Sequence, residues 1–467
     1  MIHGRATTRS DWTICTACLQ KQQKIDRLEE ELRRVKAKLR YQERTAREGP
    51  FGASTPSSKI PIKANSLEEH QARKGGAKPG HRGYGRRVAP PEQIHRTLSA
   101  HLPACCPDCG TELQHRGRRR RTVLDAQPLR AERQLWLLDV KRCPKCRKTF
   151  RAKPPGVPSK GLLSNRLLAV VAIEHYLHGR TLGQLQRQLG VGYGAICQAM
   201  HALAKRLAPV MPRLLWDYRA ALVKHADETG WRSDGRSGYA WLFCTPRLSF
   251  FRFRSSRSAQ VAHEVLGAQP LPGTLVVDRY NAYNKAPCAI QYCFAHLSRD
   301  IEDLQKADPE DPETNRFVET ALPQLAAAMS LRTLKLSKRQ FLKQAAALRR
   351  QIQMTMQASA SNPGIQHIQN LFREKRHRMF RWTLDPDIPA ENNRAERELR
   401  PLVIARKLSF GSQSEAGAAT RETLMSVLLT LQKRSSDPLA TLTTTLDALV
   451  AKPKANVYRL LFGSDTS

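Results

Sequence analysis

Hydrophobic residues recur at helical spacing near the start of the chain. Between charged positions, five apolar residues follow one another at steps of three and four: Ile25, Leu28, Leu32, Val35 and Leu39. This heptad stripe predicts an amphipathic helix within residues 1–44. Because the stripe is short, it fits either a coiled coil between subunits or a helix docked on its own protein.

A second helical pattern covers the chain from Ser164 to Met211, and Gly190-Val191-Gly192 interrupts it. Helix, short glycine turn and helix is the helix-turn-helix layout, with the second helix expected to begin near Tyr193. We therefore predict that residues 160–215 form a helical region that reads DNA. A plain packing hairpin would give the same pattern.

After Ala220 the pattern changes to that of strands. Three apolar stretches separated by turn residues predict an antiparallel meander, over residues 221–227, 239–244 and 249–254. A helix over about 259–266 and a buried strand at 274–278 follow. Strand, strand, strand, helix, strand is the order of a ribonuclease H-like core. We assign residues 216–430 to such a domain, with a helical insertion at about 300–385 and a helical tail at 431–467.

Two strands of this predicted core end in an acid, Asp227 and Asp278. In this topology the two strands lie side by side, so the two carboxylates can meet. Carboxylate oxygens suit Mg²⁺ or Mn²⁺, and two such ions about 4 Å apart can activate an attacking hydroxyl and stabilise the leaving one. An aspartate at the end of a strand is also a common turn former, so the pair alone leaves a structural role open.

A third carboxylate is expected from a later helix. The segment 391–400 offers three glutamates: Glu391, Glu396 and Glu398. At about 100° per residue, Glu396 shares its polar face with Asn392, Asn393 and Arg400. The amides can hold the Glu396 carboxylate, and Arg400 can pair with it or reach a phosphate. Glu396 is the favoured ligand, and the alternative is a surface helix with salt bridges.

The amino-acid composition indicates what kind of partner the protein binds. The chain has 78 Lys and Arg against 41 Asp and Glu, a formal net charge of +37, which favours nucleic acid as the partner. Ribosomal, chromatin and membrane-surface proteins share such a balance. Residues 45–95 are rich in glycine and positive charge, and we predict a flexible basic linker there, which either contacts phosphates or is a solvated spacer.

Two Cys-x-x-Cys pairs predict a structural zinc ion. In a zinc ribbon over residues 96–155, the four thiolates would be those of Cys106, Cys109, Cys143 and Cys146. Leu135–Val140 is expected to form the strand that leads into the second pair. Cys105 adjoins the first pair, but only Cys106 gives the two-residue gap. The alternative is four unrelated buried cysteines.

The sequence favours a protein that acts in the cytoplasm, on DNA. No window approaches the roughly 18 consecutive apolar residues of a membrane helix, and Met1 to Asp11 lack the apolar core of a signal peptide. We therefore expect no membrane partner.

Four stretches resemble the large transposase of the bacterial insertion sequence 66 family. They are Ala226-Asp227-Glu228-Thr229 with Trp231, Val277-Asp278-Arg279-Tyr280 with Tyr283-Asn284, Ala295-His296-Leu297-Ser298-Arg299, and the run from Asn392-Asn393 to Arg400-Pro401, continued by 402–407 and Gly411-Ser412. The resemblance implies an Asp-Asp-Glu triad at Asp227, Asp278 and Glu396, with His296 and Arg299 as possible accessory residues. The family usually has Asp where Glu391 stands.

Together these expectations describe an α+β multidomain DNA transposase. With Mg²⁺ or Mn²⁺ it would cut the DNA at transposon ends and transfer the freed strands into a target, acting as a homo-oligomer on DNA. Two alternatives remain open. One is a non-catalytic, zinc-containing DNA-binding regulator derived from a transposase, and the other is a ribonuclease H-like nuclease or resolvase.

Overall fold

A computed structural model describes residues 163–307 and 309–463 without further gaps. Before them it describes 24, 25, 27, 28, 31, 32, 90–93, 109, 112, 131–142, 144, 147, 149–152 and 154–158. The chain divides into two compact units, one of which is Ile60–Glu132. The described part of that unit includes the short 3-10 helix η2 (Pro91–Gln93) and Cys109, which is exposed. The other predicted zinc ligands, Cys106, Cys143 and Cys146, lie outside the described residues, so the zinc ribbon stays a prediction.

The strand expected at Leu135–Val140 is misplaced. Residues 131–139 have no regular secondary structure, and β1 (Val140–Arg142) begins where the predicted strand ends. It pairs antiparallel with β2 (Thr149–Arg151). Leu135 and Leu137 are 90% and 89% exposed, and Trp136 and Leu138 are 45% and 42% exposed, so no residue of this run is fully buried in the part of the chain that the structure describes. Apolar residues without a surface to cover do not favour a strand.

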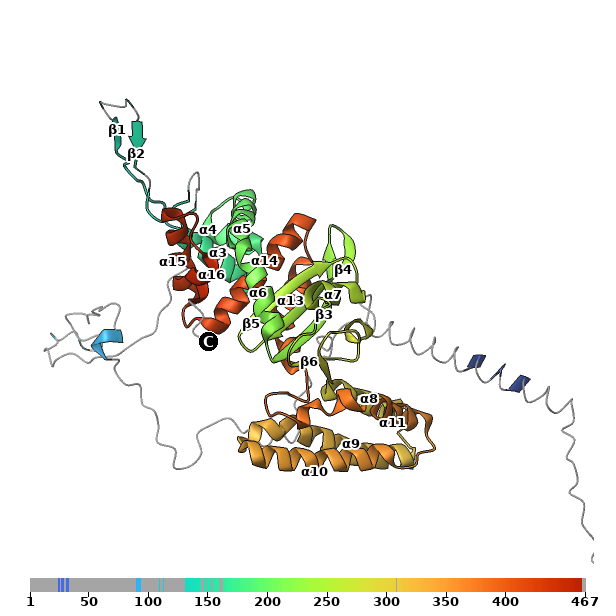
Figure 1. Ribbon diagram of the computed structural model, residues 1–467. Helices are drawn as coiled ribbons and strands as arrows, with labels where there is room; N and C mark the ends of the chain where they lie inside the picture. Colours follow the sequence, from blue (N-terminus) through green and yellow to red (C-terminus); the bar gives the residue numbers. More distant parts are fainter. Residues whose placement is uncertain are drawn as a thin grey trace, which may run out of the picture. The chain divides into compact units, whose positions relative to one another are not determined.

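The larger unit is built on a mixed sheet of five strands in the order β5-β4-β3-β6-β7. Figure 1 shows this sheet and the elements around it. Its strands are β3 (Val223–Ser233), β4 (Arg236–Thr245), β5 (Leu248–Arg254), β6 (Thr274–Val277) and β7 (Ala289–Tyr292). β3, β4 and β5 form the predicted antiparallel meander. Helix α7 (Ala259–Leu266) then leads to β6, which pairs parallel with β3 as predicted.

The turn between β3 and β4 sets the register of the meander. Asp234 and Gly235 both have positive φ angles, 50° and 72°. A two-residue hairpin with positive φ at both positions matches the right-handed twist of the strands it joins. Asp and Gly are residues that tolerate this conformation, so the predicted turn is confirmed.

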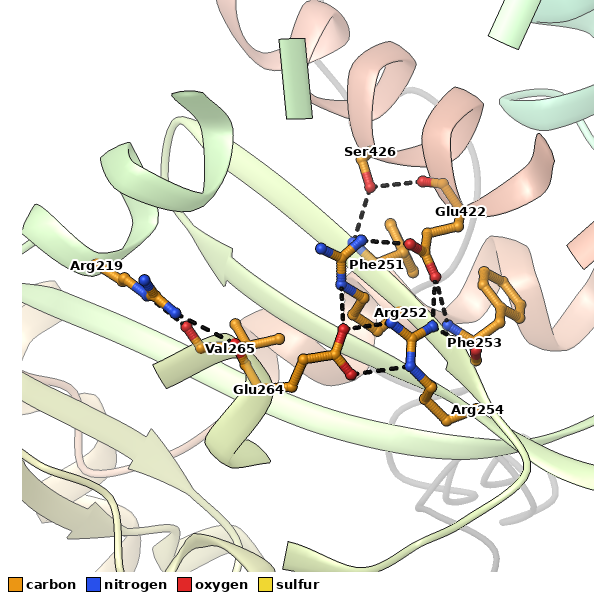
Figure 2. A network of polar contacts seen from close by, with 9 residues as sticks. All are labelled: Arg219, Phe251, Arg252, Phe253, Arg254, Glu264, Val265, Glu422 and Ser426. Carbon is orange, nitrogen blue, oxygen red and sulfur yellow. Dashed lines mark hydrogen bonds and ion pairs between the residues drawn. The ribbon is translucent and has the colours of Figure 1, made fainter. Parts of the chain in front are cut away.

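Helix α14 (Glu415–Arg434) covers the open edge of the sheet at β5. The edge strand leaves the N–H groups of alternate residues without a strand partner. Three side chains of α14 accept them: Thr430 Oγ1 from Ser249 at 3.1 Å, Ser426 Oγ from Phe251 at 2.8 Å and Glu422 Oε2 from Phe253 at 3.0 Å. Figure 2 shows the last two of these bonds.

The charged residues in Figure 2 join the same edge to α7. Glu422 of α14 forms ion pairs with Arg252 and Arg254 of β5, and both arginines also pair with Glu264 of α7. Arg219, on helix α6 (Met211–Ala220), donates to the carbonyl oxygen of Val265 at 2.6 Å near the end of α7. These contacts tie α14 and α7 to β5, and α6 to α7.

Helix α13 (Asn393–Ser409) lies along β3. Arg406 donates to the carbonyl oxygen of Gly230 at 2.6 Å and to the hydroxyl of Thr229 at 3.2 Å. Beyond the helix, Ser412 bridges to Ser233. Gly411 has a φ of 117°, and a Cβ there would lie 2.1 Å from the Arg232 carbonyl oxygen, so only glycine fits this close approach.

The predicted helix-turn-helix layout is present. Before the sheet, α3 (Asn165–Tyr176) and α4 (Leu182–Leu189) lead to the glycine turn. Gly190 takes a left-handed φ of 64°, and α5 (Tyr193–Leu207) begins at the predicted residue. The short 3-10 helix η3 (Ala208–Val210) connects α5 to α6.

Helices fill the chain between the sheet and α13. They are α8 (Phe294–Ala307), α9 (Pro312–Ser330), α10 (Lys338–Gln357), α11 (Pro363–Glu374) and the short α12 (Arg376–Met379), with 3-10 turns η5 (Leu331–Leu334) and η6 (Arg381–Thr383). α8 packs on α9 and α9 on α10, and η4 (Asn281–Tyr283) packs on α7. After α14 come α15 (Pro438–Ala451) and α16 (Val457–Phe462).

Near the N-terminus, the described residues between 24 and 32 are helical. Ile25, Leu28 and Leu32 of the predicted stripe are 48%, 53% and 54% exposed. These three residues of the stripe are therefore half exposed. Among the described helices, none is long and apolar enough to cross a membrane.

Candidate functional site

The first predicted acid, Asp227, is buried in the middle of β3 and only 4% exposed. Its Oδ1 accepts the backbone N–H of Glu228 at 2.9 Å, and its Oδ2 has no hydrogen-bond partner among the described residues. Burial raises the pKa of Asp227 well above its ordinary value, and the neighbouring carboxylates of Glu228, Asp278 and Glu396 raise it further. The carboxylates of Asp278 and Glu396 are thus near enough to Asp227 to act on its charge. The three acids are not, however, among the groups of described residues whose ligand atoms all lie within 4.8 Å of one another.

Asp278 follows the last residue of β6. The parallel register pairs His225 of β3 with Val276 of β6, and two residues further along both strands are Asp227 and Asp278. Asp278 Oδ1 accepts the N–H of Tyr280 at 2.9 Å, which fixes the turn after the strand. The parallel register of β3 and β6 therefore supports the expectation that the two aspartates lie side by side.

Glu396 lies in the first turn of α13, where the partial positive charge of the helix N-terminus favours a carboxylate. Arg299 of α8 donates to both of its carboxylate oxygens, at 3.1 and 3.3 Å. His296, one turn earlier on α8, places Nδ1 3.7 Å from Glu396 Oε1. Both predicted accessory residues of α8 therefore contact the third acid.

The expected support from Asn392, Asn393 and Arg400 is not formed. The side chain of Asn392 instead bonds to His225 Nδ1 at 2.9 Å and to the carbonyl oxygen of Ala226 at 2.8 Å. Asn392 is the N-cap of α13 and lies outside the helix, so the helical phase that placed it beside Glu396 does not apply to it. Arg400 is exposed, and within the described residues neither Asn393 nor Arg400 bonds to Glu396.

Asn392 has a different role in the site. Its bonds reach the two residues that precede Asp227 on β3, and its N–H donates to Cys293 Sγ at 3.0 Å. It thereby fixes the start of α13 against the strand that carries the first acid. Neighbouring Glu391 is half-buried, and Glu398 pairs with Lys433 at 2.7 Å, away from the three acids.

Cys293, His296 and Glu396 bring three potential ligand atoms within 4.8 Å of one another. Burial raises the pKa of the Cys293 thiol to about 12, and a protonated thiol is a poor metal ligand. Burial is also the main reason why the pKa of His296 is lowered, in spite of the nearby Asp278 and Glu396 carboxylates. A neutral imidazole beside Glu396 is chemically able to bind a divalent ion.

The sequence analysis did not single out Glu228, which is only 1% exposed. Arg257 donates to its Oε1 through Nε at 3.0 Å and Nη2 at 2.7 Å, and Tyr283 donates to its Oε2 at 2.6 Å. Burial and the Asp278 carboxylate raise the pKa of Glu228 to about 7, against the opposing effects of Tyr283 and Arg257. The sequence feature that could have identified Glu228 is its position directly after Asp227, at the end of a strand expected to be buried.

Comparison with known proteins identifies the family. The model of the family described as Transposase IS66 family matches residues 160–420, which is more than half of the chain. The chain belongs to the IS66 transposase family. A curated protein from Sinorhizobium fredii (strain NBRC 101917 / NGR234), named "Uncharacterized protein y4qI", is 26% identical over 407 residues, which cover 76% of this chain and 72% of that protein.

Membership of the IS66 family suggests transposase function, and transposases act on DNA and need a divalent metal ion. The matched range includes all three predicted acids, the two accessory residues of α8 and the helical hairpin α4–α5. The resemblance read from the sequence is therefore confirmed at the level of the family. The roles of individual residues are taken up next.

Proposed function

We propose that this IS66-family protein cleaves DNA at transposon ends and joins the freed 3′ hydroxyls to target DNA. Asp227, Asp278 and Glu396 would hold the divalent ions, Mg²⁺ or Mn²⁺. The observation that carries the proposal is the environment of Asp227, a buried carboxylate whose Oδ2 has no partner and whose neighbours are other acids. Such a group fits a bound cation, which would supply the missing partner and offset the repulsion.

The strand order supports the same proposal. The order β5-β4-β3-β6-β7, in which β4 runs antiparallel to the other four strands, fits a ribonuclease H-like core. In that core, acids on the first and fourth strands and on a later helix make one site, and here these elements are β3, β6 and α13. Glu398 competes poorly for the third position, because it already pairs with Lys433.

Divalent ions held by Asp227, Asp278 and Glu396 would supply Lewis-acid activation of the phosphodiester and of the attacking water or hydroxyl. Residues of the chain itself would orient the acids and balance their charge. Asn392 holds the start of α13 against β3, and in this proposal that contact positions Glu396 relative to the two aspartates. Arg299 neutralises Glu396 in the structure, and its guanidinium is a suitable donor for a DNA phosphate once Glu396 takes another partner.

Other parts of the chain would recognise and pair the ends. We assign end recognition to the helical hairpin α4–α5 and to the predicted zinc ribbon, whose Zn²⁺ would be structural. Pairing of subunits on DNA is assigned to the half-exposed stripe of Ile25, Leu28 and Leu32. A partly open apolar stripe on a helix is typical of a surface that meets a second copy.

The first test replaces Asp278 with asparagine. Asp278→Asn keeps the acceptor for the Tyr280 N–H but removes the charge that a divalent ion needs, so strand cleavage should fall by about a thousandfold or more. Binding of labelled end DNA, measured by gel shift, should stay within about twofold. Unchanged cleavage would overturn the assignment of Asp278.

The matched control is Asp303→Asn, which removes an exposed α8 carboxylate whose ion pair, among the described residues, is with Lys306 at 3.0 Å. Its cleavage rate should equal that of the unaltered chain.

Incubation with Mg²⁺, labelled end DNA and a target plasmid also tests the function itself. Cleavage without strand transfer would indicate a nuclease or resolvase, and binding without cleavage would indicate a regulator.

A further inference from the structure

Glu228 and Asp227 are consecutive on β3, and their side chains point to opposite faces of the sheet. On the side of Asp227, Thr229 contacts Arg406 of α13. On the side of Glu228 lie Tyr283 of η4 and Arg257, which precedes α7. The two acids therefore face different surroundings although they are neighbours in the chain.

Both oxygens of Glu228 are already occupied. Arg257 makes two hydrogen bonds to Oε1, and the Tyr283 hydroxyl makes one to Oε2. Asp227, in contrast, keeps one buried oxygen without a partner among the described residues. A carboxylate that is 1% exposed and accepts three hydrogen bonds has filled most of its roughly four acceptor positions, so it is a poorer metal ligand than Asp227.

The partners of Glu228 lead to Asp278. The Arg257 guanidinium stacks over the Tyr280 ring at 4.1 Å, and the Tyr280 hydroxyl donates back to the Arg257 carbonyl oxygen. The N–H of Tyr280 donates to Asp278 Oδ1 at 2.9 Å. Tyr280 and Tyr283 also pack edge to face, with ring centroids 6.3 Å apart.

We propose that Glu228 is a positioning residue, which holds the segment from Asp278 to Tyr283 against β3 through Arg257, Tyr280 and Tyr283. It does not bind metal itself, and it acts by keeping Asp278 beside Asp227. This inference rests on the proposed function, because it assumes that the two aspartates bind the ions. β6 is only four residues long, so the turn after it depends on such contacts for its position.

The experiment measures metal dependence in the full-length chain. Glu228→Gln removes the charge that pairs with Arg257, and Tyr283→Phe removes one donor while it leaves Glu228 and both Arg257 bonds in place. Mn²⁺ binding is followed by electron paramagnetic resonance and end cleavage by gel, both across a titration. For Glu228→Gln we expect the half-saturating metal concentration to rise about tenfold, with a cleavage rate at saturation within about threefold of the original.

Tyr283→Phe should shift the half-saturating concentration in the same direction by a smaller factor. The matched control is Glu264→Gln, which also removes a carboxylate paired with arginine, at Arg252 and Arg254, but lies on α7 away from the acids. A purely structural role would lower the melting temperature of Glu228→Gln and Glu264→Gln alike and leave metal affinity unchanged in both.

Three outcomes would overturn the proposal. Loss of cleavage at every metal concentration in a folded, DNA-binding Glu228→Gln chain would make Glu228 a ligand. Unchanged metal affinity in Glu228→Gln would remove its positioning role. If Glu228→Gln does not fold, unchanged affinity in Tyr283→Phe decides against the proposal. Mn²⁺ binding without cleavage in the unaltered chain would count against the proposed function alone.

Discussion

At the scale of single residues, Arg421 is a buried cation without a carboxylate partner among the described residues. Its Nη2 lies 2.9 Å from His175 Nε2, and its guanidinium stacks over Tyr176 at 5.0 Å and Trp231 at 5.1 Å. These partners come from α3 and from the end of β3, while Arg421 belongs to α14. A buried cation of this kind requires His175 to be neutral, because only the neutral imidazole can accept its N–H.

This requirement predicts a pH dependence of stability. Burial, and secondarily Arg421, lowers the pKa of His175 from its ordinary 6.5 to about 4. The unfolded chain therefore binds a proton at higher pH than the folded chain, so stability is present above pH 6.5 and is lost as the pH falls towards 4. At 1.36 kcal/mol per pH unit, the loss is about 3 kcal/mol.

The variant His175→Gln tests this pH dependence of stability. Its uncharged amide can donate to the Arg180 carbonyl oxygen and accept from Arg421, as the neutral imidazole does. The pKa of buried His225 is lowered to about 3, so His225 adds a similar pH dependence of stability to every variant. The test therefore compares the slopes of stability against pH between variants. Thermal melting between pH 7 and 4 should show a shallower decline for His175→Gln. The exposed His263→Gln should follow the original curve, and equal slopes in all three would contradict the prediction.

At the scale of elements, the fit between α14 and β5 follows from two repeat lengths. Four residues of helix rise about 6.0 Å, and two residues of strand advance about 6.6–6.8 Å. Side chains at 422, 426 and 430 can therefore accept the N–H groups of 253, 251 and 249, respectively. A helix caps the sheet edge in place of another strand, and this protects the edge from pairing with a second chain.

Removal of the middle acceptor should destabilise the fold. Ser426→Ala leaves the buried N–H of Phe251 without its partner, which lowers the free energy of unfolding by about 1–3 kcal/mol. Thr423→Ala is the control, since this half-buried residue of the same helix has no side-chain hydrogen bond in the described part of the chain. Denaturant titration of both variants measures the difference. A Ser426→Ala chain as stable as Thr423→Ala would show that the edge is not held by these bonds.

The elements around the site could be predicted because they follow from local patterns. Alternation gave the strands of the meander, Asp234-Gly235 gave their turn, and strand order brought Asp227 to Asp278. The partners of the acids could not be predicted in this way. Arg299 is 97 residues from Glu396, and Asn392 is 167 residues from His225, so only tertiary packing joins them. Helical phase was also misleading at Asn392, where the helix has not yet begun.

At the scale of the whole molecule, the formal net charge of +37 must be balanced when the chain is compact, and DNA phosphates are the counter-charge that fits a transposase. Binding that neutralises phosphates releases condensed cations, so affinity falls as salt rises, with a log–log slope of about −0.9 per phosphate contact. With this surplus of Lys and Arg we expect at least about six contacts, and hence a loss of about a thousandfold in affinity between 50 and 200 mM salt.

Fluorescence anisotropy with labelled end DNA measures the slope. Unrelated DNA of equal length should show a similar slope at lower affinity, because phosphate contacts carry no sequence information. A slope weaker than about −2 would mean that most of the positive charge serves another purpose than DNA binding.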